Sequence, residues 1–241
     1  MPELAEVGGP RKGVPQTLDT RLFVQLQVFT GCHEPATVVE AVRASGLEAV
    51  AYADLNDPYG VGVLLLAEDP GAMAGAGRDL YGRASFTSLR HLRDMTMMGR
   101  TYGTGREPDL EDWLLHKPRR HALDPAMPWA IWYSLRRLGS FGRLPRSEQG
   151  RIMGEHALIG RAYGEIGRAV DIRLECHGLD REDNEFVLGL IGPDLHPLSR
   201  LIKDMRSTRQ TSEFIQSMGP FFVGRAIYQA PLGDRSSGSG R

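Results

Sequence analysis

The spacing of apolar residues alternates along this chain between the period of a strand and the period of a helix, and this pattern constrains the fold more than any other feature. Strands bury every second residue, whereas helices bury residues three or four apart. In the first half the pattern predicts, in order, a strand at 22–28, a helix at 35–44, strands at 48–54 and 61–67, a helix at 70–92 and a strand at 95–102. The predicted order of elements is βαββαβ.

The second half repeats this order with little repetition of sequence. The pattern predicts a strand at 129–135, a helix at 147–166, strands at 171–176 and 185–191, a helix at 195–207 and a strand at 221–228. The simplest architecture for such a unit is a ferredoxin-like antiparallel sheet with helices on one face. Two units side by side can join their sheets and hide edge strands that would otherwise aggregate. We therefore predict an α+β fold of two ferredoxin-like repeats with joined antiparallel sheets, a dimeric α+β barrel.

The chain of 241 residues has room for one large domain or two closely packed ones. The predicted organisation is a flexible N-terminal segment (1–20), an N-terminal subdomain (21–110), a C-terminal subdomain (111–230) and a flexible tail (231–241). The first of these segments is polar and contains several Gly and Pro residues, and the tail is rich in Gly and Ser, as loose termini often are.

The charge of the chain is balanced overall but concentrated locally. The net charge is −1, which excludes a globally basic nucleic-acid-binding protein. Residues 113–151, however, contain eight Lys and Arg residues against two acidic ones, together with all three tryptophans. This segment indicates an acidic partner, and Lys117, Arg119 and Arg120 are candidates to hold its carboxylates or phosphates. A solvated charged surface is the alternative, especially for the arginines of the Gly/Pro-containing loop at 136–146.

The predicted helix at 147–166 carries a histidine in the middle of its apolar face. That face consists of Ile152, His156, Ile159, Tyr163 and Ile166. A histidine in this position can ligate iron through Nε2, and Gly160 and Gly164 would make room for a planar macrocycle beside it. The alternative is a core histidine that is hydrogen-bonded to a carbonyl group.

The predicted strand at 171–176 has one polar and one apolar face. Asp171, Arg173 and Glu175 share the polar face, because successive side chains of a strand point to opposite sides. Such a face is either a solvated surface or a source of polar groups over a cofactor, in which case Arg173 would hold an anionic oxidant.

Other signals are weak or absent. No apolar run is long enough to span a bilayer and the first residues lack the features of a signal peptide, so we expect a cytoplasmic protein. Cys32 and Cys176 are expected as buried free thiols. The Gly-rich segment at 99–105 lacks the Lys-Ser/Thr ending of a phosphate loop, and no Gly-x-Ser-x-Gly motif is present.

Four segments in the second half resemble the chlorite dismutase-like superfamily, which includes chlorite dismutases and coproheme decarboxylases. They are Glu-His-Ala-Leu-Ile-Gly-Arg-Ala-Tyr at 155–163, Gly-Leu-Asp-Arg-Glu-Asp-Asn-Glu-Phe-Val at 178–187, Met-Arg-Ser-Thr-Arg-Gln-Thr-Ser at 205–212 and Gly-Pro-Phe-Phe-Val-Gly-Arg at 219–225. The resemblance covers about residues 113–228, while the first half agrees only in its pattern of elements.

This resemblance implies a cofactor and a set of site residues. In the superfamily a duplicated ferredoxin-like fold binds haem b or coproheme in its C-terminal half through one axial histidine, which corresponds to His156. The basic pair Arg119-Arg120 falls where relatives have a basic pair, so the haem propionates would be the acidic partner, with Lys117 and Tyr102 as further anchors. Trp132 resembles the tryptophan of a family Trp-Tyr pair and would form a wall of the pocket.

The chain also departs from the family pattern at three positions. Gram-positive coproheme decarboxylases use a tyrosine radical just before the basic pair, where this chain has Leu114 flanked by Trp113. The distal arginine of chlorite dismutases falls on Ala169 or Asp171, so that Arg173 is the nearest candidate. Relatives tend to have a glutamate where this chain has Arg209. These departures indicate a subfamily with its own chemistry.

The resemblance and the residues together favour a haem-dependent oxidoreductase, peroxidase-like, that acts on a small oxidant or organic substrate. His156 is expected to be the metal ligand, and Asp171 and Arg173 the distal acid/base and anion-holding groups. The alternatives are a coproheme decarboxylase in haem biosynthesis, in which Trp113 or another residue replaces the radical tyrosine, and a non-enzymatic haem-binding protein. We expect a homo-oligomer, a pentamer or a dimer, with neither nucleic acid nor membrane as a partner.

Overall fold

The computed structural model describes residues 3–233 of the chain. Most of the predicted C-terminal tail (231–241) therefore lies outside the described residues. The N-terminal segment was expected to be flexible, but it contains two strands, β1 (Glu6–Arg11) and β2 (Val14–Leu18), that pair as an antiparallel hairpin. Lys12 and Gly13 form its two-residue turn with φ of 52° and 83°, the left-handed conformation that tight hairpin turns require.

The first repeat follows the hairpin and has the predicted order of elements. It consists of β3 (Phe23–Thr30), α1 (Pro35–Ser45), β4 (Ala49–Asp54), β5 (Val61–Ala67), α2 (Pro70–Tyr81), the short α3 (Ala84–Thr87), β6 (Arg90–His91), η1 (Arg93–Met95) and β7 (Met97–Arg100). The predicted helix at 70–92 is thus two helices, because α2 ends at Tyr81 and Gly82 follows it.

The second repeat begins after a connecting helical segment. That segment contains η2 (Asp112–His116), which is one turn of π-helix, and α4 (Lys117–Ala122). The repeat itself consists of β8 (Trp129–Arg137), η3 (Phe141–Arg143), α5 (Arg146–Glu165), β9 (Val170–Glu175), β10 (Phe186–Gly192), α6 (Leu195–Met205), α7 (Arg209–Phe214) and β11 (Ile215–Gln229). The last strand is longer than the 221–228 that the pattern predicts.

The two repeats share one sheet that closes on itself. Its strand order is β5-β4-β11-β8-β10-β9-β7-β3, and β3 also pairs with β5, while β6 adds to the free end of β3. All pairings are antiparallel, and the repeats join at two seams, β4 with β11 and β7 with β9. The predicted fold class of two ferredoxin-like repeats with joined sheets is confirmed.

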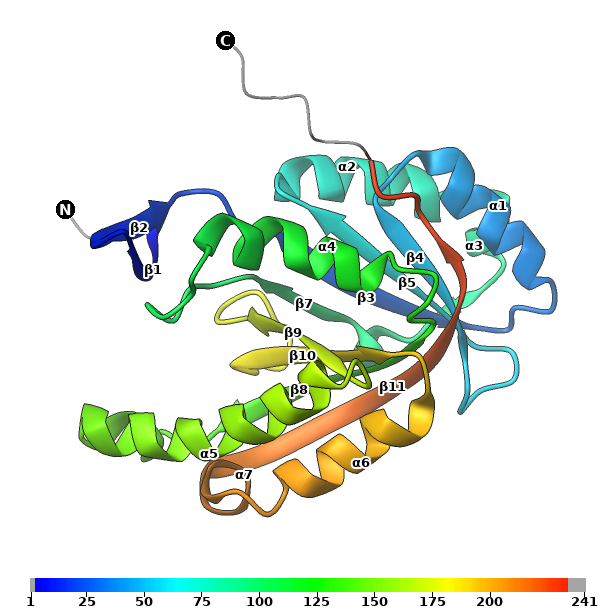
Figure 1. Cartoon of the computed structure of the whole chain (residues 1–241). Coiled ribbons are helices and arrows are strands. Elements are labelled where there is room, and N and C mark those ends of the chain that lie inside the picture. Colours follow the sequence, from blue (N-terminus) through cyan, green and yellow to red (C-terminus); the bar gives the residue numbers. More distant parts are fainter. Residues whose placement is uncertain (1–2, 234–241) are drawn as a thin grey trace, which may run out of the picture.

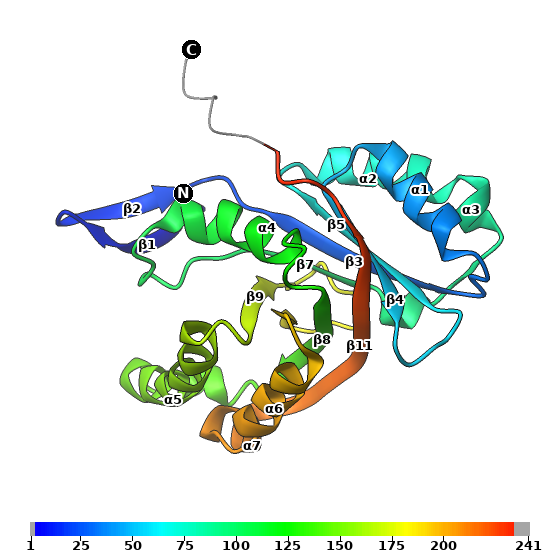
Figure 2. The same cartoon turned by 45° about the vertical axis from the view of Figure 1, so that its right-hand side comes forward.

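Helices cover the outside of this sheet on two opposite sides. In Figures 1 and 2, α1, α2 and α3 lie on one side of the strands and α5, α6 and α7 on the other, with α4 near the open space between them. Each helical group packs on its own apolar cluster, around Val38 and Leu80 in the first repeat and around Leu198 and Leu201 in the second. A third and larger cluster fills the interior of the closed sheet.

Large aromatic rings fill that interior. Trp132 and Phe222 are both completely buried there. Gly189 provides the space for Trp132, since a Cβ atom at Gly189 would lie 2.5 Å from the indole ring. Gly62 does the same for Phe222, again at 2.5 Å. The interior is therefore a packed core, and any cofactor must bind on an outer face.

Both cysteines are free and buried, as predicted. None of the helices within residues 3–233 has the length and apolar character needed to cross a membrane.

Candidate functional site

His156 lies on α5, where this helix packs against the outer face of the second repeat. Its Nδ1 atom is 3.4 Å from the hydroxyl oxygen of Thr208, the residue that caps the N-terminus of α7. The same hydroxyl donates to the carbonyl of Met205 at 2.8 Å. A hydroxyl that donates to Met205 acts as an acceptor toward His156, and this arrangement favours the tautomer with the imidazole proton on Nδ1. In that tautomer Nε2 carries the free lone pair that a metal ligand needs.

The surroundings of His156 favour this neutral form. Burial lowers the pKa of the imidazole, the positive charge of Arg173 lowers it further, and the negative charge of Asp171 partly opposes both effects. Protonation would occupy Nε2, so a lowered pKa keeps this atom free for a metal over a wider pH range.

β9 presents its polar face to this same side of the sheet. Arg173 and Asp171 form an ion pair, with Nε 2.9 Å from Oδ2, and both side chains are about one-third exposed. Ile172 and Leu174 of the same strand are buried inside the closed sheet. The predicted division of β9 into a polar and an apolar face is therefore what the structure contains, and β9 contacts both α4 and α5.

A tryptophan and a lysine from the connecting helical segment complete this cluster. The ring of Trp113 lies under two cations, with Lys117 Nζ 4.2 Å and Arg173 Cζ 4.9 Å from its centroid. The indole N–H donates to the carbonyl of Tyr102 at 3.2 Å. Burial lowers the pKa of Lys117 and raises that of the Tyr102 phenol. Lys117, Tyr102, Asp171, Arg173 and His156 are thus brought to one side of the molecule, as the sequence predicts.

A small recess lies among these groups. Its volume is about 10 Å³, and Thr101, Trp113, Lys117, Asp171 and Arg173 contribute to its lining. That volume holds about one water molecule. A much larger open groove of about 540 Å³ lies far from this cluster, between α1 and α3, and small side chains such as Ala36, Ala41 and Ala84 line it. The small recess combines Lys117, Asp171 and Arg173 with Trp113, whereas the titratable residues of the groove are Glu40 and Arg83.

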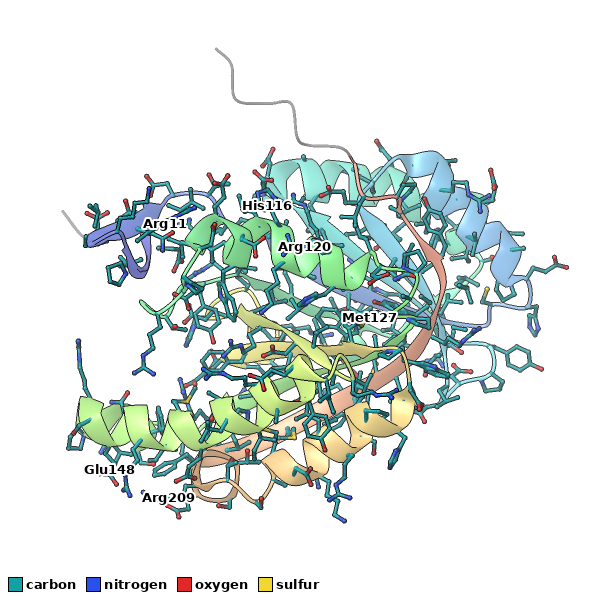
Figure 3. All side chains as sticks on the ribbon, viewed as in Figure 1. Arg11, His116, Arg120, Met127, Glu148 and Arg209 are labelled. Carbon is teal, nitrogen blue, oxygen red and sulfur yellow. The ribbon has the colours of Figure 1, made fainter. Side chains whose placement is uncertain are left out.

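Arg119 and Arg120, the two arginines expected to bind propionates, form ion pairs with other residues of the chain. Arg119 is 4% exposed, and its guanidinium bonds Glu48 and Glu68 at 2.9 Å each as well as the carbonyl of Leu115. Arg120 forms a two-pronged ion pair with Asp112. Figure 3 labels His116, the last residue of η2, and Arg120 of α4 on the same helical stretch. The side chain of Arg119 is thus enclosed by ion pairs and that of Arg120 is paired with a neighbouring carboxylate, and the binding of a propionate by either arginine stays a prediction.

Trp132 does not form a wall of this site either. It points into the closed sheet, whereas the next residue, Tyr133, points outward and stacks on Phe221 with ring centroids 4.9 Å apart. Strand alternation means that only one member of the Trp-Tyr pair faces α5. The sequence pattern leaves open which one does.

The glycines of α5 near His156 face neighbouring elements of the chain. A Cβ atom at Gly160 would lie 3.5 Å from Met205 of α6, and one at Gly164 would lie 3.8 Å from the carbonyl of Ala169. Both are ordinary van der Waals distances, so an alanine would fit at either position. That these glycines make room for a macrocycle stays a prediction.

Arg209 lies near the other end of the site and pairs with Glu213 and Glu148. Figure 3 shows Glu148 and Arg209 close together at the outer edge of α5 and α7. Because this chain has Arg209 where relatives tend to have a glutamate, the partner of the His156 imidazole is the neutral hydroxyl of Thr208 rather than a carboxylate.

His121 joins the site although the sequence did not single it out. Burial first, then the positive charges of Lys117 and Arg120, lower its pKa from 6.5 to about 4, while Asp171 and Asp112 oppose them. Within residues 3–233 its buried Nδ1 has no hydrogen-bond partner. The available signal was its spacing of four residues from Lys117, which places both on one face of α4.

Together, the fold and the site define a class: closed α+β sheets built from two ferredoxin-like repeats, with one histidine-bearing helix facing a strand with a polar outer face in the second repeat. The comparisons with known proteins agree with this class. Residues 114–227 match the family model described as chlorite dismutase. No curated protein sequence matches the chain. The family match and the shared fold support the chlorite dismutase-like superfamily that the sequence motifs indicate.

Solved structures share the whole fold at low sequence identity. A haem-binding protein from Thermus thermophilus is 17% identical, with a TM-score of 0.67 over 87% of this chain and 92% of that protein. Chlorite dismutase from Candidatus Nitrospira defluvii, in complex with imidazole, is 13% identical, with a TM-score of 0.65 over the same shares of the two chains. Similarity at this level shows a shared fold, and a shared fold does not by itself imply a shared function.

Proposed function

We propose that this protein binds haem on the outer face of the second repeat and acts as a peroxidase-like oxidoreductase, with Nε2 of His156 as the axial ligand. The observation that carries the proposal is the contact between Nδ1 of His156 and the hydroxyl of Thr208, which favours the tautomer with Nε2 free. The family match and the structural similarity to a protein described as haem-binding support the cofactor.

The residues of this face fit the chemistry of a haem. A propionate needs a cation, and Lys117 is the cation of the basic segment that remains near His156, with the Tyr102 phenol as a hydrogen-bond donor. A porphyrin needs apolar surface, and partly buried apolar side chains lie on this side of the sheet and on α5: Ile159, Phe186, Leu188, Met218 and Phe221. When bound, haem would supply redox chemistry at its iron.

Arg173 and Asp171 would act on the substrate. Arg173 has a guanidinium whose ion pair to Asp171 uses Nε, so its two terminal nitrogens can bind a small anion. The Asp171 carboxylate holds Arg173 in place and can accept a proton from a neutral oxidant such as peroxide. The recess beside them has room for a molecule of about the size of water, which favours a small oxidant as substrate.

An absorption spectrum tests the haem assignment. Protein reconstituted with haem b should show a Soret band, and the His156→Ala variant should lose or markedly shift it. His196→Ala is the matched control, because His196 is exposed at the start of α6. An unchanged spectrum in His156→Ala would refute the ligand assignment.

Incubation with iron coproporphyrin and peroxide tests the reaction. A peroxidase-like enzyme should oxidise an added electron donor and leave the porphyrin mass unchanged. A mass decrease that matches conversion of propionate to vinyl groups would identify a coproheme decarboxylase instead. Haem binding with negligible peroxide turnover would identify a non-enzymatic haem-binding protein.

We also propose that the protein assembles with copies of itself. Leu158 of α5 and Ile166, which follows the last residue of α5, are 67% and 68% exposed, although Ile166 was expected on the inward face of the helix. Burial of such side chains between copies would be favourable. Light scattering should give a mass of several chains, and Leu158→Lys together with Ile166→Lys should reduce it if α5 forms the contact.

A further inference from the structure

Trp113 holds a central position among the charged groups of the site. It belongs to η2, a turn of π-helix, and such turns frequently occur at functional sites. Its indole N–H donates to the carbonyl of Tyr102 at 3.2 Å. This bond ties the ring to the segment that follows β7, so the indole is a fixed surface rather than a mobile side chain.

Two cations rest on this one ring. Lys117 approaches from the next helical turn and Arg173 from β9, and both distances, 4.2 and 4.9 Å, are within the range of cation–π contact. Two positive charges in one place repel each other. The electron-rich face of the indole attracts both cations, and Asp171 balances the charge of Arg173 through its ion pair at 2.9 Å.

The result is a pair of cations beside a recess of molecular size. The recess of about 10 Å³ is lined by Trp113, Lys117, Asp171 and Arg173 among others. A small anion in or near this recess would meet both cations, provided that the indole keeps them there.

We propose that Trp113 is a positioning residue that holds Arg173 and Lys117 at the recess and thereby sets the affinity of the site for small anions. The role in turnover rests on the proposed function, but the anion site itself involves only this chain's own residues. The same arrangement opposes the use of Trp113 in place of the missing tyrosine, because two cations on the ring disfavour the positive charge of an oxidised indole.

Nitrite binding to the haem-free protein provides the first test. The Arg173 Nε–H signal, assigned by its loss in Arg173→Lys, should be observed by ¹⁵N NMR and should move saturably as nitrite is added. Trp113→Leu should raise the Kd for nitrite about tenfold, and Trp113→Phe, which keeps a weaker aromatic face, about threefold. Trp129→Phe is the matched control, since the Trp129 ring has its nearest cation, Arg225, at 6.0 Å and lies outside this cluster.

The spectra of the backbone amides show whether each variant is folded, and Trp113→Phe provides a mild change if Trp113→Leu disrupts η2. The proposal is overturned if nitrite does not move the Arg173 signal in the wild type. It is also overturned if Trp113→Leu leaves the Kd unchanged although Arg173→Ala raises it.

Azide binding to the haem-loaded protein provides the second test, with the Soret band as readout. The Kd for azide should rise more in Trp113→Leu than in Trp113→Phe, as the Kd for nitrite does. If both Trp113 variants abolish turnover while azide affinity is unchanged, Trp113 is a redox-active side chain and the positioning role is wrong. If the protein takes up no haem, the proposed function fails, and the nitrite experiment still decides the role of Trp113.

Discussion

The hydroxyl of Thr208 lies 3.4 Å from Nδ1 of His156 while it donates its own proton to Met205. Partners of this kind orient a ligating histidine and raise its basicity. A hydroxyl draws the Nδ1 proton less strongly than a carboxylate would. The ligand that we propose for iron is therefore a neutral imidazole with little imidazolate character.

Replacement of Thr208 tests this relationship. Thr208→Val should weaken haem binding about tenfold, the lower end of the effect of a lost outer partner of a metal ligand. It should also destabilise the protein by about 1 kcal/mol, because Thr208 caps α7 by accepting from the Thr211 amide. Thr208→Ser retains both bonds and should restore both properties. Haem titration and urea unfolding measure the two effects, and equal haem affinities of the Val and Ser variants would contradict this role.

The pH dependence of stability should reveal His121. Its pKa is about 4 in the folded protein against 6.5 ordinarily, so below pH 6.5 the unfolded chain binds more protons than the folded one. Stability is therefore complete above the unfolded pKa and falls as the pH drops from about 6.5 to 4, by at most about 3 kcal/mol from this residue.

His121→Gln removes this titration and should flatten the stability curve of the haem-free protein in that pH range. The lowered pKa of His156 contributes to the same slope, with the same sign. Urea unfolding between pH 4 and pH 7 measures the difference, and parallel curves for the variant and the wild type would show that His121 is not buried as described.

Replacement of Arg119 should lower the free energy of unfolding and leave the affinity for haem unchanged. Arg119→Met removes the cation that Glu48 and Glu68 share and should cost about 1 to 3 kcal/mol, because the guanidinium is buried while the two carboxylates are 23% and 34% exposed. Arg120→Met is the control, since its ion pair to Asp112 is half-exposed and should contribute less than about 1 kcal/mol. Lys117→Met should weaken haem binding with little effect on stability. Haem affinity that falls in Arg119→Met but not in Lys117→Met would reverse our assignment of these residues.

Because Trp132 packs against Gly189 inside the closed sheet, a larger residue at position 189 should clash with the indole ring. Gly189→Ala would place a methyl group 2.5 Å from the indole and should destabilise the protein by about 1 to 3 kcal/mol, the usual cost of overpacking a core. Trp132→Phe should relieve part of that cost, so the double variant should be less unstable than the sum of the single ones. Gly139→Ala, in an open loop with no atom near its Cβ position, is the control. Additive effects of Gly189→Ala and Trp132→Phe would argue against their contact.

The local pattern of the sequence predicts several features of this protein well. The alternating periods predict two βαββαβ repeats, since each element must bury one face whatever its neighbours are. The same argument places His156 on the inward face of α5 and puts Asp171 and Arg173 together on one face of β9. Residues 6–18 were not predicted as a hairpin, because their apolar residues are few; the hairpin is held by Gln16, which bonds the carbonyls of Gly9 and Glu107 and the amide of Leu110.

The sequence by itself determined the repeats, the family and the face on which each candidate lies within its own element. Only the tertiary structure decided which candidates meet. Trp132 faces the interior of the closed sheet and Tyr133 faces its outside. The two faces of β8 differ in this way only because the neighbouring strands close the sheet. The basic segment likewise divides in space, because Arg119 finds two carboxylates from the first repeat while Lys117 finds Trp113 and β9. A local excess of positive charge indicates an acidic partner, and long-range packing decides which cations that partner can reach.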